Sequence, residues 1–172
     1  MRYYTGIGSR ETPKEVLDLF IIVGKYLAQK GFTLRSGHAQ GADQAFEIGC
    51  DQVKGKKEIY IPWKGFENSA SGLVVSKEKA FELGAKFHPA WERLSDGAKK
   101  LQARNSHQIL GEELCELSDF VICWTKNGKG SGGTGQAIRI ANHYHVPVFD
   151  AGSYNNIEEV KKELKKFLLE RK

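Results

Sequence analysis

Short apolar segments alternate with longer amphipathic segments along most of the chain, and this alternation constrains the fold more than any other feature. Five segments have the length and composition of strands, at residues 3–8, 33–36, 58–61, 119–124 and 146–149. Segments with helical spacing lie at 13–31, 42–53, 104–114, 134–144 and from 156 onward. The pattern is typical of parallel strands joined by crossover helices. We therefore predict an α/β fold, with a Rossmann-like doubly wound, mostly parallel sheet and helices on both faces.

Two of the expected helices carry start signals. Thr12, Pro13 and Glu15 predict a helix with a hydroxyl cap, Pro at its first position and Glu at its third. Asn156 and Glu159 predict a capped terminal helix with a capping box. The stretch 63–117 is less regular, and there we expect loops and short helices before the helix at 104–114.

The length of the chain favours a single domain. It has 172 residues with no internal repeat and no linker-like stretch, so one Rossmann domain is expected over residues 1–172. Neither a signal-peptide stretch nor a run of about 18 apolar residues occurs, which predicts a cytoplasmic protein without membrane contact. The formal net charge of +5 permits anionic partners without identifying one.

The cysteine and histidine patterns argue against a metal site. Cys50, Cys115 and Cys123 are odd in number and form no CxxC pair, so we interpret them as reduced core residues. The five histidines show no spacing typical of zinc ligands. We therefore predict neither a metal nor a cofactor.

Glycine is concentrated where a ligand would bind. Five of the 19 glycines fall within residues 128–135, and three expected strand-to-helix loops are glycine-rich, at 6–10, 36–43 and 128–136. In open α/β sheets the ligand crevice lies beyond the carboxyl ends of the strands, and the unpaired amides of a helix start seat phosphate well. The candidate ligand-binding residues of these loops are Gly8, Ser9, Arg10, Ser36, Gly37, Gly41, Ala42, Asp43, Gly132, Gly133, Thr134, Gly135 and Gln136.

Two common nucleotide-binding motifs are absent from these loops. The first loop, GIGSRE at 6–11, lacks the third glycine of the dinucleotide fingerprint, and Ser36 stands where an acidic ribose ligand is expected. In the third loop Lys129 is followed by Gly130 rather than by Ser or Thr, which excludes a Walker A loop.

Four strings in the chain resemble a known superfamily. They are GSR at 8–10, SGHAQGAD at 36–43, RN at 104–105 and SGGTGQA at 131–137. Together they resemble the SLOG superfamily, which joins the DNA-processing protein A (DprA/Smf) proteins with the LOG-type phosphoribohydrolases. The string at 36–43 is similar to the SGxAxGxD signature. The resemblance covers roughly residues 3–150 and is strongest to short, single-domain DprA-like proteins of phages and bacteria.

The resemblance implies a Rossmann-like fold that binds nucleotides or nucleotide-derived ligands, usually as a homodimer or higher homo-oligomer. In the LOG-type enzymes a PGGxGTxxE motif supplies a glutamate that acts on an N-glycosidic bond together with an upstream arginine. Here Ile138 stands in place of that glutamate and Ser131 in place of the proline. The resemblance also identifies Arg104, followed by Asn105, as a candidate phosphate ligand, because a guanidinium suits bidentate phosphate contacts; the alternative is a solvated helix arginine.

Several candidate residues have a second interpretation. Asp43 either faces a ligand or stabilises the start of its helix through the helix dipole. Thr134 either binds a ligand or caps its helix. Trp124 either forms the floor of a pocket or packs in the core. The segment at 88–91, in a long connection, is a candidate lid.

Three functions are compatible with the sequence. The first is binding of a small nucleotide or nucleotide-derived ligand, such as an ADP-ribose-like signal, by a sensor or sequestering protein. The second is single-stranded DNA binding and recombinase loading, as the DprA resemblance implies. The third is a nucleotide N-glycosidase or phosphoribohydrolase that uses Asp43 or Glu47 in place of the missing glutamate. That missing glutamate favours binding over catalysis.

Overall fold

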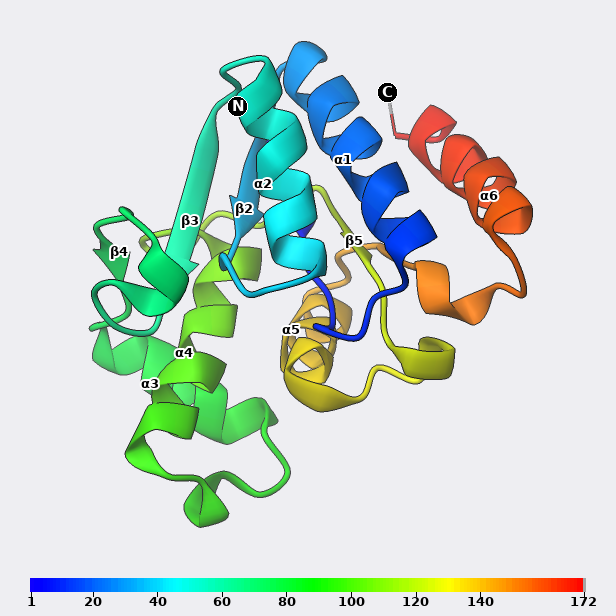
Figure 1. The fold of residues 1–172 in the computed structure, drawn as a ribbon. Coiled ribbons are helices and arrows are strands. Elements are labelled where there is room, and N and C mark those ends of the chain that lie inside the picture. The colour runs from blue at the N-terminus through cyan, green and yellow to red at the C-terminus, as the bar shows by residue number, and fades with distance from the viewer. Residues whose placement is uncertain (172) are drawn as a thin grey trace.

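The chain folds into one six-stranded sheet with helices on both faces (Figure 1). The computed structural model describes residues 1–171; Lys172, the last residue of the expected domain, lies outside the described residues. All strand pairs in the described part are parallel, and the strand order is β4-β3-β2-β1-β5-β6. The strands are β1 (Arg2–Gly6), β2 (Phe32–Ser36), β3 (Lys57–Ile61), β4 (Leu73–Val74), β5 (Phe120–Cys123) and β6 (Val148–Asp150). The Rossmann-like, doubly wound fold predicted from the alternation is confirmed.

Two groups of helices cover the two faces of the sheet. One face packs against α1 (Lys14–Gln29), α2 (Ala42–Gln52) and α6 (Ile157–Leu169). The other packs against α3 (Glu78–Phe87), α4 (Asp96–Leu110) and α5 (Gly132–His143). Short 3₁₀ helices lie at η1 (Phe66–Asn68), η2 (Trp91–Arg93), η3 (Lys126–Gly128) and η4 (Ala151–Ser153).

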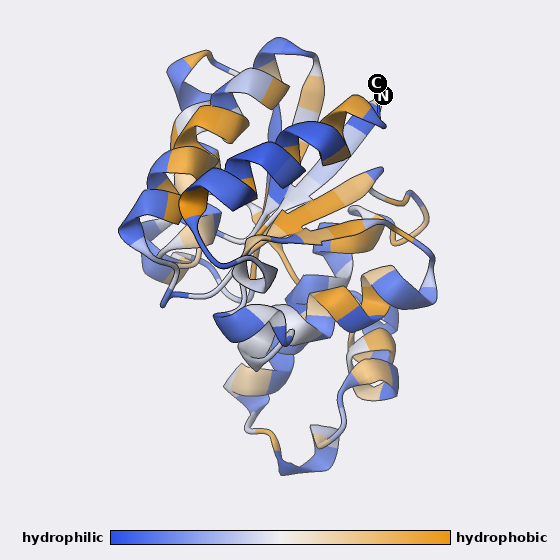
Figure 2. Cartoon of the chain, turned by 90° about the vertical axis from the view of Figure 1, so that its right-hand side faces the viewer, coloured by the Kyte–Doolittle hydropathy of each residue, from blue (hydrophilic) through white to orange (hydrophobic). Residues whose placement is uncertain are grey.

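The strands are buried on both sides, which explains their nearly continuous apolar sequence. In β5, Phe120 and Ile122 belong to the core beneath α1, α2 and α6, whereas Val121 and Cys123 belong to the core on the opposite face. This division follows the two-residue period of a strand. Figure 2 shows the hydrophobic strands at the centre of the molecule, between helices with hydrophilic outer turns. In the part of the chain that the structure describes, no helix is both long and apolar enough to cross a membrane.

Two glycines allow α1 and α2 to pack closely. A Cβ on Gly49 of α2 would lie 2.0 Å from the carbonyl oxygen of Ile21, and a Cβ on Gly24 of α1 would lie 2.4 Å from that of Phe46. Because both obstacles are backbone atoms in regular helices, they cannot move aside without separating the helices.

Several expected element boundaries differ from the structure. The first strand ends at Gly6 rather than at residue 8, and the helix expected at 104–114 begins at Asp96, where Ser95 caps it, and ends at Leu110. The sequence analysis also missed β4 and α3 as separate elements. A polar surface on the first turns of α4 hides its apolar spacing, and β4 has only two residues.

The cap predictions were partly wrong. Pro13 rather than Thr12 occupies the cap position of α1. The hydroxyl of Thr12 donates to the carbonyl of Ser9 (2.6 Å). Asn156 caps α6 as predicted, but the carboxylate of Glu159 accepts from the amide of Asn155 rather than from that of the cap residue.

The interpretation of all three cysteines as core residues was also partly wrong. Cys50 and Cys123 are buried, whereas Cys115 is exposed in the loop that follows α4. That loop runs over the surface, so an apolar residue type there does not imply burial.

We expect Gly49→Ala to lower the free energy of unfolding by about 2–3 kcal/mol, because the added methyl group forces α1 and α2 apart. Gly97→Ala is the matched control, since the nearest atom to its added Cβ is Trp63 Cζ3 at 3.9 Å. That change should be neutral or stabilise by up to about 1 kcal/mol. Urea unfolding followed by circular dichroism measures both, and equal stabilities of the two variants would contradict the close-packing argument.

Candidate ligand-binding site

The candidate site lies where the strand order reverses. From β1 the chain adds β2, β3 and β4 on one side and β5 and β6 on the other, so the loops after β1 and β5 diverge. Such a switch point opens a crevice at the carboxyl ends of the strands. Here the crevice is a cavity of about 330 Å³ between the loops after β1 and β2, helix α4 and the first turn of α5.

Nine of the fifteen predicted site residues line this cavity. They are Gly8, Ser9, Arg10, Asp43, Arg104, Asn105, Gly132, Gly133 and Thr134. The structure therefore brings together residues from all four strings on which the superfamily resemblance depends, although the strings are far apart along the chain.

Asp43 joins the first two loops. Its side chain is almost fully buried, and its two oxygens accept hydrogen bonds from the amides of Gly8 (3.1 Å) and Ala39 (3.4 Å). Burial raises the pKa of Asp43 to about 6, although the charge of Arg104 and the backbone donors act in the opposite direction. The amides that we expected to hold a phosphate in these two loops are thus already bound to a carboxylate of the chain itself.

In the third loop the amides of Gly128 and Gly130 bind Thr125, and the available amides are those of the first turn of α5. The cap residue of α5, Ser131, makes no side-chain capping bond, and Gly132 and Gly133 are exposed at the cavity. Asn105 Nδ2 donates to the carbonyl of Gly133 (3.0 Å), which fixes this first turn against α4. Thr134 does not occupy the cap position and lines the cavity instead. The first turn of α5 therefore presents partial positive charge to the cavity.

Arg104 is a buried residue of α4 rather than a solvated one. Its Nη1 donates to the carbonyls of Gly37 (2.7 Å) and Tyr60 (3.0 Å), and its Nε donates to Asn105 Oδ1 (3.0 Å). Burial lowers the pKa of its guanidinium to about 10, so the group stays charged at neutral pH. Within residues 1–171, Nη2 has no hydrogen-bond acceptor, and Arg104 lines the cavity. One edge of the guanidinium is therefore available to a ligand.

Four of the remaining predicted residues support the loops without lining the cavity. The hydroxyl of Ser36 donates to the carbonyl of Gly6 (2.5 Å) and thereby ties β2 to β1. Gly37 lies beneath Arg104, and a Cβ there would lie 2.5 Å from its Nη1. Gly41 is the cap residue of α2 with φ +92°, and Ala42 packs beneath Gly8.

The other two, Gly135 and Gln136, face the packing between α5 and its surroundings. Gln136 Nε2 donates to the carbonyl of Gly84 in α3 (3.1 Å), and its oxygen accepts from Arg139 (2.9 Å). A Cβ on Gly135 would lie 2.1 Å from the carbonyl of Gly130, so this glycine permits the loop to fold back on the helix.

The sequence analysis missed several residues that line the cavity, chiefly Phe66, Leu101, Gln102 and Gln108. Leu101, Gln102 and Gln108 lie on α4, three or four residues from Asn105, and therefore on the same face of the helix. This spacing would have identified them once the bounds of α4 were known. Phe66 lies in η1, and its ring faces the Arg104 guanidinium at 5.4 Å. No local motif marks Phe66.

The proposed lid and tryptophan roles are not part of this cavity. Neither the segment 88–91 nor Trp124 lines it, and Trp91 packs against Gly84 of α3. No group of three or more His, Cys, Asp or Glu side chains in residues 1–171 is arranged to hold a metal ion.

Comparison with known proteins gives a likeness at the level of structure. No protein family and no curated protein matches the sequence. A solved structure of DNA processing protein A from Helicobacter pylori, described for its single-stranded DNA binding mode, matches with a TM-score of 0.55 and 20% sequence identity. The match covers 87% of this chain and 64% of that chain.

The fold is DprA-like. This chain spans less than two thirds of the DprA chain that it matches, and at 20% identity the likeness establishes the fold alone.

The raised pKa of Asp43 predicts a pH-dependent stability. Because the folded protein holds this proton more tightly than the unfolded chain does, the free energy of unfolding should fall as pH rises from about 4 to about 6, by up to about 3 kcal/mol, and then level off. Asp43→Asn cannot titrate, so its stability should fall less over this interval. Urea unfolding at several pH values from 4.5 to 7.5 measures the two slopes, and parallel slopes would contradict the raised pKa.

Proposed function

We propose that this chain binds a small nucleotide or nucleotide-derived ligand and acts as a sensor or sequestering protein. The proposal depends on one observation: two groups of hydrogen-bond donors without acceptors among the described residues face the same cavity. The first-turn amides of α5 at 132–134 and the free edge of Arg104 face the same cavity. A phosphate is the chemical group that best satisfies a helix N-terminus and a guanidinium together.

The remaining cavity wall supports contacts to a base and a sugar. Gln102 and Gln108 provide neutral donors and acceptors, while Phe66 and Leu101 provide apolar surface. A volume of about 330 Å³ is at the lower end for ligand sites, which suits a mononucleotide moiety. A few polar groups in a partly apolar pocket are typical of small-molecule recognition.

The same geometry favours binding over hydrolysis. Among the described residues that line the cavity, Asp43 is the sole carboxylate, and both of its oxygens accept backbone hydrogen bonds. Glu47, the other carboxylate considered, contacts His38 and Lys57 instead and does not line the cavity. Release of free base from nucleoside monophosphates, lost in Asp43→Asn, would support a hydrolase instead.

Thr134→Glu should weaken binding of AMP at least roughly tenfold, because it places a carboxylate where the phosphate is expected. A negative charge in the first turn of α5 stabilises that helix, so the loss should occur without unfolding. Gln29→Glu makes the same charge change on an exposed residue of α1, outside the cavity, and should leave binding unchanged. Isothermal titration calorimetry measures the affinity for AMP of the wild type and of both variants. Absence of binding by the wild type to any common nucleotide at millimolar concentration would contradict the proposal.

Single-stranded DNA binding is the second candidate function, favoured by the DprA structure in the comparison and by the net charge of +5. A DNA strand would place one of its phosphates at α5 and others on the surface. The affinity for an oligothymidylate should then fall steeply with salt, with a log–log slope of about −0.7 per contacted phosphate. Binding of a mononucleotide should depend much less on salt. Fluorescence anisotropy at two or more salt concentrations distinguishes the two functions.

A further inference from the structure

The carboxylate of Glu67, in η1, is bound by the first two loops of the site. Arg10 Nη2 lies 3.3 Å from Oε1, and Gln40 Nε2 donates to Oε2 (3.1 Å). A guanidinium from the loop after β1 and an amide from the loop after β2 thus form an anion-binding position. At present that position is occupied by a side chain of the chain itself.

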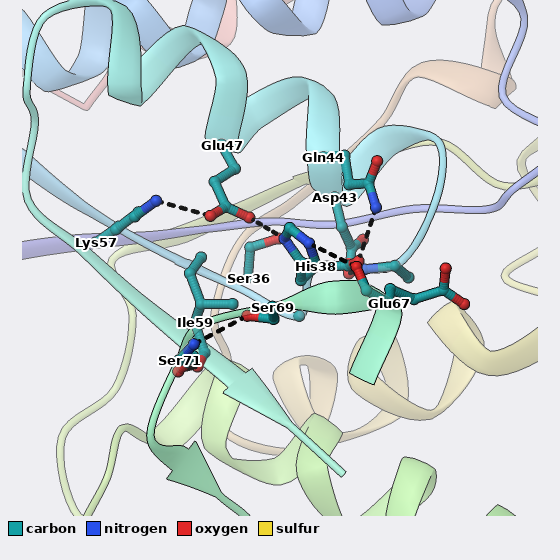
Figure 3. A network of polar contacts seen from close by, with 12 residues as sticks. Ser36, His38, Asp43, Gln44, Glu47, Lys57, Ile59, Glu67, Ser69 and Ser71 are labelled. Carbon is teal, nitrogen blue, oxygen red and sulfur yellow. Dashed lines mark hydrogen bonds and ion pairs between the residues drawn. The ribbon is translucent and has the colours of Figure 1, made fainter. Parts of the chain in front are cut away.

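A third contact holds the backbone of the same segment. The two ring nitrogens of His38 lie 2.6 Å from Glu47 Oε1 and 3.2 Å from the carbonyl oxygen of Glu67 (Figure 3). His38 thus lies between the carboxylate of Glu47 in α2 and the backbone of Glu67 in η1. Lys57 donates to the other oxygen of Glu47 (2.7 Å) and orients this carboxylate.

The segment is held in a conformation that its residues disfavour. Glu67 and Asn68 both have left-handed backbone angles, with φ +49° and +63°. Such angles are uncommon for residues other than glycine and Asn, so Glu67 is the strained residue, and such strain persists where surrounding contacts enforce it. Loss of the contacts to Glu67 would therefore favour a different conformation of η1.

The anion position adjoins the proposed nucleotide cavity. Arg10 lines that cavity, and so does Phe66, the neighbour of Glu67 in the chain. The Glu67 side chain is 24% exposed and that of Arg10 is 60% exposed, so solvent and ligands can reach the pair. Exposed ion pairs of this kind are weak and readily exchanged.

We propose that the Glu67 carboxylate occupies the position of a second anionic group of the ligand. The ligand class is then a nucleoside diphosphate, or a compound derived from one. Its first phosphate binds at α5, and its second phosphate displaces Glu67 from Arg10 and Gln40 and releases η1. This inference rests on the proposed nucleotide-binding function and deepens it by naming the ligand class.

The test compares ADP with AMP by isothermal titration calorimetry at low ionic strength. In Glu67→Gln the affinity for ADP should rise roughly two- to fivefold, the range expected for an exposed ion pair, whereas the affinity for AMP should stay the same. Arg10→Ala should abolish the preference for ADP over AMP. Glu11→Gln removes the same charge from an exposed neighbour that does not line the cavity, and it should change neither affinity.

Trp63 provides a readout of η1 itself in the wild-type protein. Its ring packs edge-on against Phe66, with centroids 5.5 Å apart. Displacement of Glu67 should therefore change the tryptophan fluorescence on addition of ADP but not of AMP. Trp63→Phe should remove this ADP-specific change, which separates it from signals of Trp91 and Trp124.

The outcomes separate this inference from the function on which it rests. If AMP and ADP bind the wild type, but Glu67→Gln leaves their affinity ratio unchanged and Trp63 reports no difference, the second anion position is overturned and nucleotide binding stands. If no variant binds either nucleotide, both proposals are overturned. A rise in the ADP-to-AMP affinity ratio in Glu67→Gln, absent in the Arg10→Ala background, supports the second position.

Discussion

The buried carboxylate of Asp43 is the interaction on which the geometry of the site depends. It accepts hydrogen bonds from the loop after β1 and from the loop after β2, and so sets the position of each loop relative to α2. A buried charge is costly unless several donors compensate it, and the raised pKa reflects the part that remains uncompensated. The carboxylate therefore orders two loops at the expense of their amides, which are no longer free for a ligand.

The positive groups that remain line the same cavity. The first turn of α5 and the guanidinium of Arg104 face the interior, while Arg10 is engaged by Glu67 at the mouth. Helix α4 makes this arrangement possible because its side chains contact two of the loops, at Gly37 and at Gly133. One helix thus links the second and the third glycine-rich loops.

Much of the fold was predictable because strands buried on both sides and amphipathic helices leave strong periodic patterns. The glycine-rich loops also marked the correct edge of the sheet, and nine predicted residues line one cavity. Three features in the middle of the chain were not predicted, namely the two-residue β4, α3 as a separate helix and the polar first half of α4. Gly135 and Gln136 were predicted as ligand contacts because they share a string with residues 132–134, yet the helical turn directs them toward packing.

By itself, the sequence determined the class of the fold, the edge of the sheet at which the loops gather and the residue types available there. These follow from local periodicity and from the general behaviour of parallel sheets. Only the tertiary structure decided which donors stay free. Whether the amide of Gly8 faces a ligand or the carboxylate of Asp43 depends on a contact between residues 35 positions apart. The pairing of Arg10 with Glu67 likewise joins residues separated by 57 positions. Such pairings arise from packing in three dimensions, which no local pattern encodes.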